Sequence, residues 1–216
     1  MVVYTPDDEP YLGRESVFQF DTILQLFIEE QTRVGARTRQ MQLSPLQEAA
    51  AELVPSASSI ALSIRELVRQ GYLLSAHILM RPLFERVATL SHLIENPTEV
   101  ALWREGWPHK SRPSLRQRIR AMHDVKGGPA DAGTPPSAEE IRRLLDGLNG
   151  LVHGDPAAAL HGAILMDDGS AGFTIGKDLA SPNRADEVCF FTTMMLIVLL
   201  ARSAQLFPQA DDSCEE

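Results

Sequence analysis

The segment 148–155 (LNGLVHGD) places His153 at the end of a predicted helix, with Asn149 one turn before it. The carbonyl end of a helix carries a partial negative charge, which favours the protonated imidazole. His153 could therefore act as a general acid or contact a phosphate group. A histidine that only caps the helix end explains the same pattern, so both interpretations stay open.

A line of polar side chains runs along the predicted helix 72–95. At about 100° per residue, His77, Arg81, Glu85, Ala88 and His92 fall within roughly 80° of one another. One hypothesis is a polar pocket that binds a small molecule around His77, Arg81 and Glu85. The alternative is an Arg81–Glu85 ion pair on a solvated face, with the histidines exposed.

The third pattern is a basic segment. The chain has a net charge of −9, but seven Lys and Arg residues and only two acidic residues lie between positions 104 and 126. The segment predicts a surface that could contact a phosphate backbone, with Arg116, Arg118, Arg120 and His123 as the contacts. A solvated basic helix that balances an acidic protein is the alternative.

The chain contains, in order, a helix with LMRPLFE, a later helix that ends in NGLVHGD and an apolar final helix. Over residues 60–205 this order resembles uncharacterised bacterial helical families that are related in shape to the HEPN superfamily. The resemblance implies a helical bundle that dimerises. Active members carry an arginine, a polar residue, three variable positions and a histidine, and they cleave RNA. Asn149 matches the polar residue and His153 the histidine, but Leu148 stands at the arginine position.

Two hypotheses follow from this resemblance. The first is an RNA-directed protein, such as a metal-independent endoribonuclease that serves as a toxin or phage-defence component with an antitoxin-like partner. In it His153 acts on the 2′-hydroxyl or leaving oxygen, Asn149 orients the phosphate and Arg81 replaces the missing arginine. The second is a non-catalytic helical module that dimerises or binds a ligand or protein partner. Leu148 favours the second hypothesis, and the basic segment favours the first.

The elements that would position these residues are helices. Helical periodicity and capping patterns predict an all-α bundle in a single domain, 1–216, with one small β-hairpin near 160–176. Ser44-Pro45-Leu46-Gln47 is a capping box for a helix that runs to position 70, with a break at Pro55. We expect flexible ends at 1–13 and 208–216 and a mobile loop at 126–136.

Composition limits the environment. The sequence predicts a cytoplasmic protein on three grounds. Its two cysteines are poorly placed for a disulfide, its N-terminal segment is acidic, and its longest apolar run, of about 14 residues, is too short to span a membrane. No motif indicates a metal site or a cofactor. The final helix is apolar on most of its circumference, which predicts a homodimer through Phe190, Phe191, Met194, Met195, Ile197, Val198 and Leu199.

Overall fold

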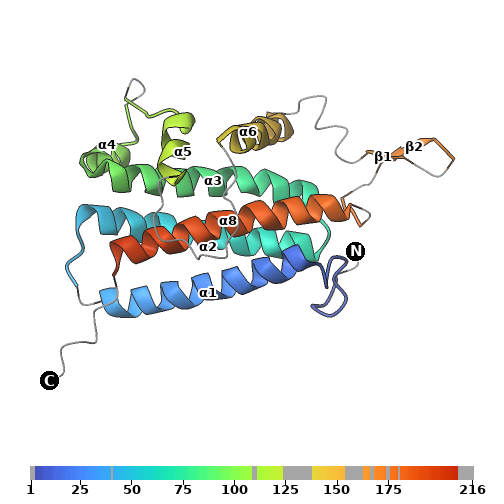
Figure 1. Cartoon of the computed structure of the whole chain (residues 1–216), viewed down its shortest axis with the longest axis horizontal. Coiled ribbons are helices and arrows are strands. Elements are labelled where there is room, and N and C mark those ends of the chain that lie inside the picture. Colours follow the sequence, from blue (N-terminus) through green and yellow to red (C-terminus); the bar gives the residue numbers. More distant parts are fainter. Residues whose placement is uncertain are drawn as a thin grey trace.

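The computed structural model describes residues 3–39, 41–108, 111–123, 138–153, 163–165, 168–173, 176–179 and 181–208. It is mostly helical, which confirms the predicted helical bundle. Figure 1 shows four long helices lying side by side. They are α1 (Glu15–Thr38), α2 (Pro45–Arg69), α3 (Leu73–Glu95) and α8 (Pro182–Leu206). The predicted loop 126–136 lies outside the described residues, as does most of the expected flexible end 208–216.

Local capping chemistry explains where α2 begins. The Ser44 hydroxyl accepts a hydrogen bond from the Gln47 backbone N–H, and the Gln47 side chain accepts one from the Ser44 N–H, as the sequence predicts. The predicted break at Pro55 is wrong, because α2 continues through it. Val54 and Ala57 are buried on either side of the proline, and this packing holds the helix together despite the missing N–H.

The turn between α2 and α3 requires glycine. Gly71 has φ +78°, and a Cβ atom there would lie 2.7 Å from the Leu179 side chain. The Gly71 carbonyl accepts a hydrogen bond from the Asp178 N–H at 2.8 Å, and the Asp178 carbonyl accepts one from the Tyr11 hydroxyl. The segment 176–179 is therefore held against the α2–α3 turn.

Helix α3 lies at the centre of the half of the bundle that carries the candidate residues. It contacts α2 and α8, and it also contacts α5 (Leu115–His123) and α6 (Ala138–His153) (Figure 1). The short elements η1 (Pro97–Glu99) and α4 (Val100–Arg104) follow its C-terminal end. As a result, most of the α3 surface is covered by neighbouring helices, including the face that the sequence predicts to be polar.

A small antiparallel pair of strands lies where the sequence predicts a hairpin. Strand β1 (Ala163–Leu165) pairs with β2 (Ala171–Phe173), with Ile164 opposite Gly172. Asp168, Gly169 and Ser170 lie in the connection, where the Asp168 carboxylate accepts hydrogen bonds from the Ser170 N–H and hydroxyl. Gly169 has φ +80°, a conformation that suits glycine in such a turn.

Helix α8 is a core helix more than a surface helix. It packs against α1, α2 and α3, and Met194, Met195 and Leu199 are buried, whereas Phe190 is 44% exposed. Much of the apolar surface that the sequence assigned to a dimer interface is thus used inside the bundle. By length and hydropathy α8 is the one helix of the described residues that could cross a membrane, and 56% of its most apolar window is buried. A core helix passes the same test, so this is weak evidence for a membrane span.

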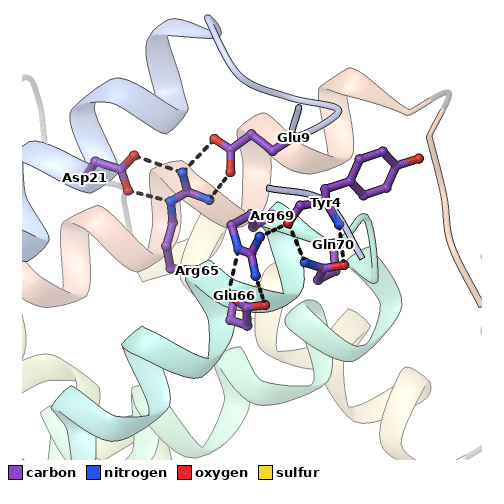
Figure 2. A network of polar contacts seen from close by, with 7 residues as sticks. All are labelled: Tyr4, Glu9, Asp21, Arg65, Glu66, Arg69 and Gln70. Carbon is purple, nitrogen blue, oxygen red and sulfur yellow. Dashed lines mark hydrogen bonds and ion pairs between the residues drawn. The ribbon is translucent and has the colours of Figure 1, made fainter. Parts of the chain in front are cut away.

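The segment 3–13 is attached to the bundle more closely than a flexible end would be. Tyr11 is 3% exposed, and the Glu9 carboxylate receives two hydrogen bonds from Arg65, at 2.7 and 2.9 Å (Figure 2). Arg65 also pairs with Asp21 of α1, and the neighbouring Arg69 pairs with Glu66. We call these five charged residues, Glu9, Asp21, Arg65, Glu66 and Arg69, the N-terminal network.

Candidate functional site

A cleft of about 770 Å³ lies between α3, α5 and α6, and it brings together residues that the sequence analysis treated separately. Leu115, Ile119 and Leu145 supply its apolar part. Its polar lining consists of Arg81 from α3, Arg116 and Arg120 from α5, and Glu139, Arg142, Asp146 and Asn149 from α6. We call this the α3–α5–α6 cleft. Helical spacing explains the pairing on α5, because positions 116 and 120 lie one turn apart on one face.

The cleft has more positive than negative groups. Four arginines face two carboxylates, and Arg142 is already paired with Glu139 at 2.7 Å. Arg116 and Arg120 are exposed, and neither has a carboxylate within ion-pair distance among the described residues. In a chain with a net charge of −9, this is a local concentration of positive charge that could hold an anion.

Arg81 and Glu85 form the i,i+4 ion pair that the sequence analysis gave as an alternative. The Arg81 Nε–H donates to Glu85 Oε1 at 3.0 Å, and the two side chains are 20% and 37% exposed. The pair does not use all the Arg81 donors, because Nη1 is buried and no atom of the described residues accepts from it. Arg81 also lines the cleft, so both interpretations of this residue hold in part.

Arg118 does not lie on the same face of α5 as Arg116 and Arg120. It is 5% exposed, and its Nη1 donates to the Thr89 hydroxyl of α3 at 2.8 Å. Its guanidinium lies 5.7 Å from the ring centre of Trp107, which has φ +45° and is itself buried. The expectation that Arg116, Arg118 and Arg120 form one surface is wrong for Arg118, because residues two apart on a helix point in nearly opposite directions.

The histidines of α3 are buried, not exposed. His77 is 5% exposed, its Nδ1 contacts the Leu73 carbonyl at 2.9 Å, and its Nε2 lies 3.8 Å from Glu187 of α8. His92 is 8% exposed, and its Nε2 lies 3.0 Å from Glu99. Neither lines the cleft, so the structure does not bring together His77, Arg81 and Glu85 as a small-molecule pocket. The reason is that α8 and η1 cover positions that local periodicity leaves open.

The predicted catalytic residues are only partly brought together. Asn149 is half-buried and shares the cleft with Arg81, as the hypothesis that Arg81 replaces the family arginine requires. His153 is the last residue of α6, is exposed, and is not part of the cleft lining. Leu148 is 1% exposed because its side chain points with Ile141, Leu144 and Leu145 into the core. The position that corresponds to the family arginine is therefore occupied by a core side chain.

One predicted contact cannot be placed. His123 is the last residue of α5, and its side chain lies outside the described part of the structure. Among the described residues there is also no group of three or more His, Cys, Asp or Glu side chains that could hold a metal ion.

A second hollow, of about 720 Å³, lies at the first turns of α1 and α8. Its lining has one arginine, Arg14, against three carboxylates, those of Glu15, Asp186 and Glu187, so it does not favour an anion. Arg14 pairs with Asp186, which also accepts a hydrogen bond from the Ser16 hydroxyl, and hydrogen bonding from Arg14 lowers the pKa of Asp186. We therefore treat the α3–α5–α6 cleft as the candidate site.

The sequence analysis missed Glu139, Arg142 and Asp146. All three lie on the exposed side of α6, opposite the core positions Ile141, Leu144 and Leu148. A signal was present, because positions 142, 146 and 149 recur at helical spacing and end at the selected Asn149. From the sequence alone they look like ordinary solvent-exposed positions. Their place in the cleft becomes clear only when α5 is known to line it with α6.

Comparisons with known proteins return no match to a protein-family model, to a curated protein or to a solved structure. The function is therefore inferred from the residues and the geometry of the α3–α5–α6 cleft.

Proposed function

We propose that this chain is a HEPN-like RNA-binding protein that holds the phosphate backbone in the α3–α5–α6 cleft. One observation carries the proposal: three helices direct Arg81, Arg116, Arg120 and Asn149 into a single cleft of about 770 Å³. Arginine donors and an amide are the groups that most often contact phosphate oxygens. A single-stranded backbone suits a cleft with an apolar part, because bases can pack against Leu115 and Ile119 while phosphates meet the arginines.

Binding without cleavage fits the geometry better than nuclease activity does. The family arginine position is filled by Leu148 in the core, and His153 lies outside the cleft that holds Asn149 and Arg81. A general acid must reach the reacting oxygen through a hydrogen bond or one water molecule. The roles of toxin, phage-defence component and partner of an antitoxin-like protein remain predictions from the resemblance alone.

The test is binding of a labelled single-stranded RNA of about 10 nucleotides as a function of salt. Arg116→Glu with Arg120→Glu should lower affinity at least about tenfold and reduce the salt slope by about 1.4, since each phosphate contact contributes about 0.7 for a single strand. Both side chains are exposed, so folding should be unaffected. The control is Arg33→Glu, an exposed arginine of α1 outside the cleft, which should leave affinity and slope nearly unchanged.

The same assay separates binding from cleavage. His153→Ala should leave RNA affinity unchanged, because His153 does not line the cleft. Cleavage of the RNA by the wild type that His153→Ala abolishes would instead support the endoribonuclease hypothesis. An unchanged salt slope in the doubly substituted α5 variant would remove the cleft as the RNA site.

We also propose a homodimer, as the resemblance implies. The support is apolar surface left on the two neighbouring helices α1 and α8, where Phe18 is 68% and Phe190 is 44% exposed. Large exposed aromatic side chains often mark protein contacts. Sedimentation at high micromolar concentration should give the mass of two chains. The double variant Phe18→Ser, Phe190→Ser should sediment with the mass of one chain. A monomeric wild type would rule the dimer out.

A further inference from the structure

Arg81, which lines the cleft, and Arg118, on the core side of α5, have buried donors that nothing in the described chain accepts. Arg81 uses Nε on Glu85, while its Nη1 is buried without an acceptor. Arg118 uses Nη1 on Thr89, while its Nε is buried without an acceptor. Leaving a buried charged donor unsatisfied is costly, so such groups need an explanation.

Arg118 stands out against another buried arginine of the bundle. Arg202 of α8 is 4% exposed, and its Nε is also buried without an acceptor among the described residues. Its guanidinium nevertheless has Glu95 at 3.3 Å and further hydrogen bonds to Gln205 and the Ala121 carbonyl. Arg118 is buried to the same degree and has no carboxylate within ion-pair distance among the residues that the structure describes. The chain thus neutralises one buried guanidinium and not the other.

Glu85 is the carboxylate that pairs with Arg81, and this is the ion pair that Glu85 forms among the described residues. Burial lowers the pKa of Arg118, the charge of Glu85 opposes that effect, and the charges of Arg112 and Arg81 add to it. With 37% of its side chain exposed, Glu85 can turn away from Arg81 into solvent without leaving a buried charge behind.

We infer that the Glu85 carboxylate binds Arg81 where an RNA phosphate would bind. A bound phosphate replaces this carboxylate, and the buried guanidinium of Arg118 stabilises the incoming anion. The inference rests on the proposed function and adds the phosphate subsite and its internal competitor. A guanidinium presents the same donors to a carboxylate and to a phosphate, so the two anions compete for Arg81. Among the described residues no carboxylate pairs with Arg118, so this guanidinium keeps its positive charge unpaired after the exchange.

The experiment measures binding of the 10-nucleotide RNA and, separately, of inorganic phosphate to the full chain. Glu85→Gln keeps the shape of the side chain and removes its charge, so both ligands should bind about threefold to tenfold more tightly. Glu66→Gln is the matched control, because Glu66 is also a helix residue paired with an arginine but belongs to the N-terminal network. It should change neither affinity.

The gain must depend on Arg81. Arg81→Gln should weaken binding of both ligands, and adding Glu85→Gln to that variant should produce no further gain. Glu85→Asp keeps the charge but shortens the side chain, so its affinity should lie between those of the wild type and Glu85→Gln. This variant keeps the test decisive if Glu85→Gln folds poorly, as a thermal unfolding scan would show.

Each result bears on one of the two claims. The inference is overturned if Glu85→Gln binds with the same affinity as the wild type, or if Glu66→Gln gains as much affinity as Glu85→Gln. The proposed function would still hold in that case, provided that RNA binding depends on Arg116 and Arg120. Phosphate binding that tightens in Glu85→Gln, in a chain that binds no RNA, supports the subsite and rejects RNA as its ligand.

Discussion

Arg65 of α2 and Arg118 of α5 are both mostly buried arginines, but they differ in whether carboxylates of the chain pair with them. Arg65 meets two carboxylates in the N-terminal network, Glu9 and Asp21 (Figure 2). Burial by itself lowers the pKa of Arg65, but hydrogen bonds to Asp21 and Glu9 raise it above its ordinary value. Arg118 has a lowered pKa, chiefly because of burial.

The difference teaches how to separate structural from ligand-binding charges. A buried arginine whose carboxylates come from its own chain holds elements together, as Arg65 joins α2 to α1 and to the N-terminal segment. A buried arginine without such a carboxylate among the described residues, near a cleft lined by further arginines, is the kind of group that we propose meets an anion from outside.

The largest effect is expected where an arginine is placed with no partner at all. Leu148→Arg should lower the free energy of unfolding by about 3–5 kcal/mol, because it buries an uncompensated charge among Ile141, Leu144 and Leu145. Urea unfolding measures this loss. A stable Leu148→Arg variant that cleaves RNA would contradict the placement of this side chain in the core.

Removing Arg65 should have the next largest effect. Arg65→Met leaves the Glu9 carboxylate, 2% exposed, without its partner and should cost about 3 kcal/mol in unfolding free energy. Affinity for RNA should not change, since neither residue lines the cleft. A loss of RNA binding in a folded Arg65→Met protein would break the distinction between the two groups of arginines.

Arg118 should respond in the opposite sense. Arg118→Met removes an unpaired buried charge and keeps an apolar side chain against Trp107, so unfolding free energy should stay equal or rise by about 1 kcal/mol. RNA affinity should fall. Arg202→Met is the control, because Arg202 has Glu95 as a partner and its loss should destabilise the fold.

The smallest effect concerns pH and the paired charges. The pKa of Asp186 is lowered from 3.8, first by its hydrogen bond from Arg14, so the pair stabilises the fold above about pH 4. That contribution is lost as the pH falls through the lowered value. Arg14→Gln should therefore be less stable than the wild type at pH 7, and the difference should shrink as the pH falls below about 4. A constant difference across this range, in thermal unfolding, would argue against the pair.

Local signals predicted the elements well. The Ser44–Gln47 capping box and the end of its helix near position 70 depend on neighbouring residues only, and both appear in the structure. The break at Pro55 failed because packing along α2 outweighs one missing hydrogen bond.

The site was less predictable because it depends on which helices meet. The sequence selected Arg81, Asn149, Arg116 and Arg120 on three separate patterns, and only the packing of α5 and α6 on α3 joins them. The same packing covers His77 and His92, which no local spacing shows. The inward direction of Arg118, in contrast, follows from helical spacing once Arg116 and Arg120 are taken as the exposed face. The roles of Arg142 and Asp146 required the tertiary structure for the same reason.

The most direct test observes the arginine side chains themselves. In a ¹⁵N-labelled protein, the Nε–H signals can be assigned by single substitutions and followed as the 10-nucleotide RNA is added. The signals of Arg81 and Arg118 should shift, because a phosphate enters their surroundings, while those of Arg65 and Arg202 should stay in place. Shifts confined to Arg65 and Arg69, or no shifts at saturating RNA, would contradict the account.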